Sequence, residues 1–114
     1  MRAALLLLLL MAAPAAAAAT AEAPPSRPAG GEALFKARCA LCHEGAGPGA
    51  IMLGRRLGQD RALLSHRTDL QAPYVKAIVR HGLGSMPPIS RVEVTDPELD
   101  QIAAWLARNS GKGG

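Results

Sequence analysis

Both cysteines of this chain lie three positions apart and are followed directly by a histidine. The segment CALCH, residues 39–43, contains Cys39, Cys42 and His43. Two thiols at this spacing can form a redox disulfide, contribute to a zinc site, or form thioethers to a haem. The rest of the sequence bears on which of these three chemistries applies.

A redox disulfide and a zinc site each leave the position of His43 unexplained. A thioredoxin-like C-x-x-C motif is expected near a βαβ pattern, and the sequence shows no such pattern. A site with two cysteines and two histidines needs histidines about three to five residues apart. The two other histidines, His66 and His81, are much further apart than that.

Covalent haem attachment accounts for all three residues. On one helical turn Cys39 and Cys42 share a face and can form thioethers to the two vinyl groups of one porphyrin. His43 is then carried under the ring, where its imidazole can bind the iron. C-x-x-C-H is the sequence signature of c-type haem attachment, so the motif predicts one covalently bound haem c.

The N-terminal segment is typical of a secretory signal peptide. Residues 1–21 begin with Arg2, continue through an apolar run and end in small residues, with cleavage expected after Ala19 or Ala21. The apolar run is shorter than the roughly 20 residues that span a bilayer. We therefore expect export to the periplasm, where c-type haem is attached in bacteria, and no stable membrane insertion once the signal is cleaved.

The remaining chain is expected to form one small domain. Residues 22–30 are rich in proline and alanine and read as a flexible lead-in, residues 31–109 as the folded domain, and residues 110–114 as a flexible tail. A domain of about 80 residues has a marginal apolar core, and this chain has one Phe, one Tyr and one Trp. A prosthetic group would supply the missing core volume.

The charge of the chain favours a protein partner over nucleic acid. The net charge is +4, and four arginines, at positions 55, 56, 61 and 67, fall in one short segment. A solvated face or a partner-docking surface fits this segment. The aromatic interleaving and strongly basic stripe of a nucleic-acid site are absent.

Hydrophobic spacing and capping signals predict an all-α class with substantial loops. Three helices are predicted at residues 31–42, 73–80 and 95–109, with a shorter one at 60–66. Thr95 and Glu98 fit a capping box at the start of the last helix. Residues 44–58 and 82–94 are predicted to be irregular, and no alternating pattern is long enough to build a sheet.

The sequence resembles the class I, single-haem cytochromes c over residues 31–106. The resemblance lies in GEALFKARCALCH, YVKAIVRHG, GSMPPIS and DPELDQIAAWLA, in that order. It implies the cytochrome c fold, with crossing N- and C-terminal helices and loops wrapped around one covalently bound haem. It also implies that Gly31 and Phe35 pack against Ile102 and Trp105, with a glycine needed where the helices cross closely.

The resemblance implies Met86 as the second axial ligand of the iron, opposite His43. Met86 heads the segment MPP in a loop between two helices, where Pro87 and Pro88 stiffen the chain. Three other residues carry groups that could bind the iron: Met52, which we expect to serve core packing, His66, expected at the surface, and His81, expected to interact with a helix dipole.

Supporting roles also follow from the resemblance. A backbone carbonyl of Gly47–Pro48 would accept a hydrogen bond from His43. Tyr74 would either donate to a haem propionate or to the methionine sulfur, or pack as a core aromatic. Propionate partners would come from three arginines: Arg55, Arg56 or Arg67.

The expected function is one-electron transfer by a periplasmic haem protein that is not itself an enzyme. The finer pattern is similar to small cytochrome subunits that accept electrons from exported flavin or quinone dehydrogenases, such as that of p-cresol methylhydroxylase. Under this resemblance a dehydrogenase supplies the electron and a downstream cytochrome or oxidase removes it. The alternative is a haem enzyme or gas sensor with an open or displaceable sixth coordination site.

Overall fold

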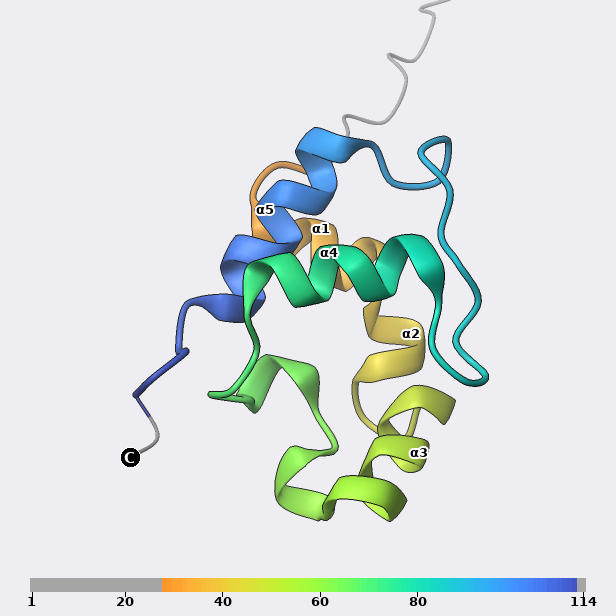
Figure 1. Cartoon of the computed structure of the whole chain (residues 1–114), viewed down its shortest axis with the longest axis vertical. Helices are drawn as coiled ribbons and strands as arrows, with labels where there is room; N and C mark the ends of the chain where they lie inside the picture. The colour runs from red at the N-terminus through yellow and green to blue at the C-terminus, as the bar shows by residue number, and fades with distance from the viewer. Residues whose placement is uncertain (1–27, 113–114) are drawn as a thin grey trace, which may run out of the picture.

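The computed structural model describes residues 28–112, which contain five α-helices and two short 3₁₀ turns (Figure 1). The elements in order are α1 (Gly31–Arg38), α2 (Ala40–His43), α3 (Pro48–Leu57), η1 (Gln59–Arg61), η2 (Leu64–His66), α4 (Ala72–His81) and α5 (Asp96–Ala107). This range contains no strand, only an isolated bridge between Leu83 and Met86. The predicted all-α class is confirmed. The expected signal peptide, residues 1–21, and residues 22–27 of the lead-in lie outside the described residues.

The core is built where the first and last helices meet and α4 covers them (Figure 1). On α1, Leu34 is 1% and Phe35 0% exposed; α5 contributes Leu99, Ile102, Ala103 and Leu106. The Phe35 ring lies 5.0 Å from that of Trp105, centroid to centroid. The helix pairing expected from the sequence is therefore confirmed, and each large side chain buried here contributes roughly 1.5–3 kcal/mol.

The crossing of α1 and α5 leaves no room for a side chain at Gly31. A Cβ atom there would lie 2.2 Å from the Gln101 carbonyl oxygen and 2.5 Å from Trp105 Cβ. Both obstacles belong to the rigid part of α5, so they cannot rotate away. The physical reason for a glycine at this position is thus the close approach of two helix backbones.

Gly31→Ala is expected to destabilise the protein by about 3 kcal/mol, because the helices must separate to admit the methyl group. Urea unfolding of the purified protein measures the loss. Gly54→Ala in α3 is the matched control, since the added Cβ would meet only the movable amide end of Gln59. Equal stability losses in the two variants would contradict the close crossing.

The last helix begins and ends on specific side-chain contacts. Thr95 Oγ1 accepts from the Glu98 N–H at 3.4 Å, and Glu98 Oε2 accepts from the Thr95 N–H at 2.8 Å, which confirms the capping box. At the other end, the Arg108 guanidinium lies 4.0 Å from the centre of the Trp105 ring and donates to the Ser65 carbonyl at 3.1 Å. These contacts fix α5 at both ends.

The predicted helix at residues 31–42 is wrong in its continuity. The chain breaks at Cys39, whose φ of −121° departs from helical values, so α1 ends at Arg38 and α2 runs from Ala40 to His43. The short helix predicted at 60–66 is also replaced, by the turns η1 and η2. Leu63 has extended backbone angles and separates these two turns.

The irregular stretch predicted at residues 44–58 is wrong, because most of it forms α3. Pro48 occupies the first helical position, where its fixed φ and missing N–H suit a helix start. Gly58, with φ of 99°, ends the helix. The glycines of GAGPGA obscured a helix whose two boundary signals were both present in the sequence.

The fourth helix and the loop that follows it agree with the prediction. α4 spans Ala72–His81, and Gly82, with φ of 76°, ends it. Residues 82–94 then form the expected loop before α5. This loop passes along one side of the molecule (Figure 1). After α5, Ser110 Oγ donates to the Leu70 carbonyl and the Gly111 N–H donates to the Thr68 carbonyl at 3.2 Å.

Candidate haem site

The CALCH segment forms one helical turn that carries three of the four predicted haem-binding residues: Cys39, Cys42 and His43. The Cys39 carbonyl accepts hydrogen bonds from the backbone N–H groups of Cys42, at 3.2 Å, and His43, at 3.0 Å. Both thiols are free; Cys42 is exposed and Cys39 is half-buried. The turn therefore presents two thiols three positions apart and an imidazole directly after the second, as the haem interpretation requires.

Burial raises the pKa of the Cys39 thiol to about 11, with a further contribution from the neighbouring Cys42. The thiol therefore keeps its proton at neutral pH. Thioether formation adds sulfur and hydrogen across a vinyl double bond, and a protonated thiol holds both atoms.

The imidazole of His43 is held in a form that suits metal binding. Burial lowers its pKa, so the ring is neutral at neutral pH. Nδ1 is buried and has no hydrogen-bond partner among the described residues. Gly49 lies against this edge of the ring, since a Cβ there would be 2.9 Å from Cε1 and 3.0 Å from Nδ1. Because Nδ1 is covered, Nε2 is the nitrogen left for the iron.

The hydrogen bond expected between His43 and a carbonyl of Gly47–Pro48 is not formed. The Gly47 carbonyl instead accepts from the Ile51 N–H at 3.0 Å, because it caps the first turn of α3. Gly47 packs on the CALCH turn, and a Cβ there would lie 2.6 Å from the carbonyl oxygens of Leu41 and Cys42. The segment thus supports the ligand turn through close backbone packing.

Sequence reasoning missed Gly49 as a residue of this site. A Cβ at Gly49 would come within 2.8 Å of the Cys42 carbonyl oxygen as well as touching His43. The only signal was the glycine-rich composition of GAGPGA, which reads equally well as a loop. The structure shows that glycine is needed here because α3 starts directly against the imidazole.

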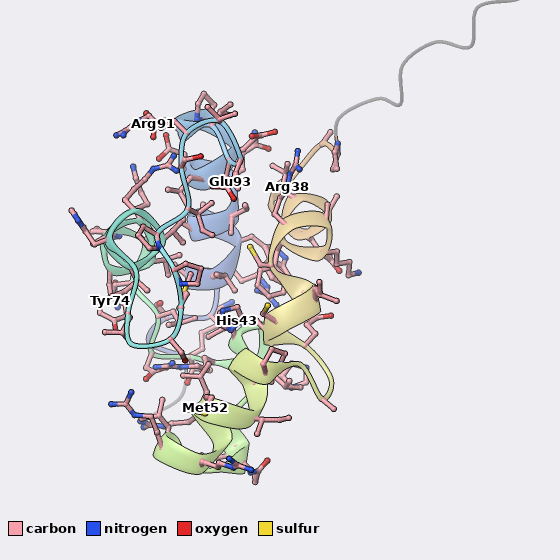
Figure 2. The ribbon with its side chains drawn as sticks, turned by 90° about the vertical axis from the view of Figure 1, so that its right-hand side faces the viewer. Arg38, His43, Met52, Tyr74, Arg91 and Glu93 are labelled. Atoms are coloured by element: carbon pink, nitrogen blue, oxygen red, sulfur yellow. The ribbon has the colours of Figure 1, made fainter. Side chains whose placement is uncertain are left out.

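Met86 lies in the loop that follows α4 and is half-buried. Its backbone exchanges two hydrogen bonds with Leu83, each of 3.0 Å, which closes a tight turn around Gly84. Figure 2 shows His43 between α2 and this loop, which stands across from α2. The loop bearing the predicted distal ligand therefore faces the side of the molecule that carries His43.

The competing ligand candidates lie at the surface. His66 is exposed, as predicted, and His81 is exposed in the last turn of α4. Met52, on α3, is 44% exposed, so the expectation that it packs in the core is wrong for the described structure. Tyr74, on α4, is 52% exposed and is likewise not a core aromatic.

The three arginines considered as propionate partners differ in what they contact. Arg67 donates two hydrogen bonds of 2.8 Å to Asp69, and these raise its pKa. Its guanidinium is therefore already paired with a carboxylate. Arg55 and Arg56 are exposed in the last turn of α3.

The residues around CALCH fit a haem better than a zinc ion. Among residues 28–112, no three His, Cys, Asp or Glu side chains are grouped so that they could hold a metal ion. Large apolar side chains are instead left exposed on α2, α3, α4 and the following loop: Leu41, Ile51, Met52, Leu57, Tyr74, Leu83 and Val92. In Figure 2, Tyr74 lies to the left of His43 and Met52 lies below it. A porphyrin covering part of this surface would remove apolar area from water.

Within the same described range, none of the helices is long and apolar enough to cross a bilayer.

The comparisons with known proteins agree with this chemistry. Residues 26–106 match the family described as cytochrome c oxidase, cbb3-type, subunit III. The chain is 33% identical over 85 residues to cytochrome c6 of Cyanidioschyzon merolae, covering 75% of this chain and 77% of that protein. It is 30% identical over 83 residues to cytochrome c6 of Aphanizomenon flos-aquae, covering 73% of this chain and 91% of that protein.

The fold, the CALCH turn and these similarities lead to the same assignment. The protein binds haem c covalently and transfers electrons to and from redox protein partners; it is not an enzyme. The chain belongs to the class I, single-haem cytochromes c.

Proposed function

We propose that Cys39 and Cys42 hold the haem through thioethers and that His43 and Met86 are the two axial ligands of its iron. The observation that carries this proposal is the CALCH turn, in which His43 is neutral and Gly49 covers its Nδ1. Support for Met86 comes from its position, since it is half-buried in the loop that stands across from α2 (Figure 2).

Each residue has a distinct task in this arrangement. A haem bound here supplies an iron that gains and loses one electron. His43 donates a neutral imidazole nitrogen and Met86 a neutral thioether sulfur, and this pairing raises the reduction potential. Cys39 and Cys42 fix the position of the ring relative to His43. With both axial positions filled by the protein, no position is left for a substrate, so the site suits electron transfer.

The proposed place of action is the periplasm, after removal of residues 1–21. The signal-peptide pattern of this segment supports export. We place the protein between an exported flavin or quinone dehydrogenase, as donor, and a cytochrome or oxidase, as acceptor. The pattern YVKAIVRHG…MPP…DPELDQIAAWLAR supports this placement.

The charge distribution favours an acidic partner. Arg55 and Arg56 lie exposed at the end of α3, and Leu57 beside them is 41% exposed. Opposite charges steer transient redox encounters and raise the association rate. Such encounters use small interfaces, and a mixed basic and apolar surface of this kind suits one.

Met86→Ala is expected to abolish the weak far-red sulfur-to-iron absorption band of the oxidised protein and to lower its reduction potential. The reason is that Met52, the other methionine among residues 28–112, lies exposed on α3. Met52→Ala is the matched control, because Met52 is exposed on α3 and should leave both properties unchanged. Persistence of the band in Met86→Ala would overturn the ligand assignment and favour an open or displaceable sixth site, as in a haem enzyme or gas sensor.

A further inference from the structure

One arginine holds the loop that carries Met86 through hydrogen bonds to two of its backbone carbonyls. Arg80 is in the last turn of α4, and its side chain is only 13% exposed. Its Nη1 donates to the Ile89 carbonyl at 3.0 Å, and its Nη2 donates to the Val94 carbonyl at 2.9 Å. Nη2 also lies 2.7 Å from Asp96 Oδ1, at the start of α5. One guanidinium therefore joins α4, two points of the loop and α5.

The position of Ile89 explains why these contacts matter for Met86. Pro87 and Pro88, which separate the two residues, have no backbone N–H with which to fasten the chain. Ile89 is the next residue with both groups, and both are used: its N–H donates to the Val79 carbonyl at 2.8 Å and its carbonyl accepts from Arg80. The stiff two-proline segment thus runs from Met86 to an anchor that Arg80 completes.

The other end of Met86 is fixed by the turn with Leu83 and by close packing at Gly82. A Cβ at Gly82 would lie 2.7 Å from the Met86 carbonyl oxygen and 3.0 Å from the Pro88 nitrogen. The loop therefore touches the end of α4 directly. Loss of the Arg80 contacts would free the Ile89 and Val94 side of the loop while leaving the Leu83 turn in place.

The way Arg80 is buried indicates more than a surface ion pair. Its Nε is buried and has no hydrogen-bond partner among residues 28–112. An unpaired buried donor costs stability, and sites that violate such a rule are often functional. A lysine could not replace these contacts, since only the planar guanidinium fork presents several donors in fixed directions.

We propose that Arg80 is a positioning residue for Met86, holding the loop so that the methionine sulfur stays on the iron. This inference rests on the proposed ligation by Met86. Without Arg80 the loop samples arrangements in which the sulfur has left the iron. An external ligand binds those arrangements, so its apparent affinity rises with their population.

The test is titration of the oxidised holoprotein with imidazole, followed by the far-red band. Arg80→Ala is expected to bind imidazole about tenfold more tightly than the unaltered protein, because a larger fraction of molecules has the sulfur off the iron. Its reduction potential should also fall. Arg80→Lys should lie nearer to Arg80→Ala than to the unaltered protein, since a single ammonium cannot serve both carbonyls.

Arg91→Ala is the matched control. Arg91 Nε also binds Asp96, at 2.8 Å from Oδ2, but its side chain is 71% exposed. The Arg91→Ala substitution removes the same type of charge from the same carboxylate, and it should change imidazole affinity less than about twofold. Equal imidazole affinities in Arg80→Ala and Arg91→Ala would overturn the proposal.

Two further variants separate this proposal from general instability and from the proposed ligation. Phe35→Leu weakens the pairing of α1 with α5 without removing any hydrogen bond of Arg80, and it should leave imidazole affinity unchanged. In a Met86→Ala background, Arg80→Ala should have no added effect on imidazole binding. If Met86→Ala keeps the far-red band, the proposed ligation by Met86 is wrong. If Met86→Ala loses the band while Arg80→Ala and Arg91→Ala bind imidazole equally well, only the positioning role of Arg80 is wrong. Should Arg80→Ala not fold, the imidazole affinity of Arg80→Lys is compared with that of Asp96→Asn. Asp96→Asn retains both contacts of Arg80 with the loop carbonyls, so it takes the place of the control.

Discussion

A variant in which Cys39 and Cys42 are both replaced by alanine is expected to keep no haem after denaturation. The two thioethers are the proposed covalent links, and the described residues contain no other cysteine. Once the chain unfolds, axial ligation alone cannot retain the ring. Denaturing electrophoresis with haem staining, or the intact mass of the denatured protein, measures the loss, which should be complete.

Leu41→Ala is the control for this variant. Leu41 lies between the two cysteines and is 88% exposed, so its loss should leave haem attachment intact. Cys39→Ala and Cys42→Ala, taken singly, should each leave one thioether and therefore a covalent haem whose spectrum shows one unreacted vinyl group. If haem stays bound to the denatured variant that lacks both cysteines, the covalent attachment is at another residue.

Phe35→Ala is expected to destabilise the folded protein by about 3–5 kcal/mol. The ring is 0% exposed and packs between the α1 and α5 backbones against Trp105. Small domains have total stabilities of only about 5–15 kcal/mol, so this single change removes a large part of the margin. The measurement is the midpoint of urea unfolding of the purified holoprotein, provided that the dependence of the unfolding free energy on urea concentration is unchanged.

Two milder variants show which part of that loss is volume and which is the aromatic contact. Phe35→Leu keeps most of the apolar volume and is expected to cost about 1.5 kcal/mol or less. Arg108→Ala removes the cation from the Trp105 ring together with the hydrogen bonds of Arg108 to the Trp105 and Ser65 carbonyls, and it is expected to cost about 1 kcal/mol. If Phe35→Ala lost no more stability than Phe35→Leu, the neighbouring side chains would have filled the space of the ring without leaving a cavity. That result would contradict the packing described.

The parts of the fold that the sequence predicted are those with boundary signals and a clear apolar spacing. For α5, Thr95 and Glu98 marked the start and Leu99, Ile102 and Leu106 marked the buried face. For α4, Gly82 marked the end. In each case a local cause, either a cap or a stop, acts within the element and can be read without knowing what the helix packs against.

The parts that were missed depend on neighbours distant in sequence or on the balance of opposing local signals. α3 carries Gly49 and Gly54 inside it, which lowers its intrinsic helix propensity. Gly47 and Gly49 pack closely against the CALCH turn, and hydrophobic periodicity does not show this packing. The break at Cys39 likewise has no composition signal.

The chemistry of the site was predictable from the sequence, whereas its support was not. The thiols and imidazole of CALCH are fixed by residue type and spacing, so one turn determines them. The role proposed for Arg80 depends on which carbonyls its guanidinium reaches, and these lie nine and fourteen positions further along the chain. A basic residue near a helix C-terminus is ordinary, so nothing in VRHG distinguishes Arg80.

Cys39 follows α1 directly and is half-buried in the folded protein, whose core is built where α1 and α5 meet. Haem attachment before α5 docks would therefore find the Cys39 sulfur more accessible than attachment after it.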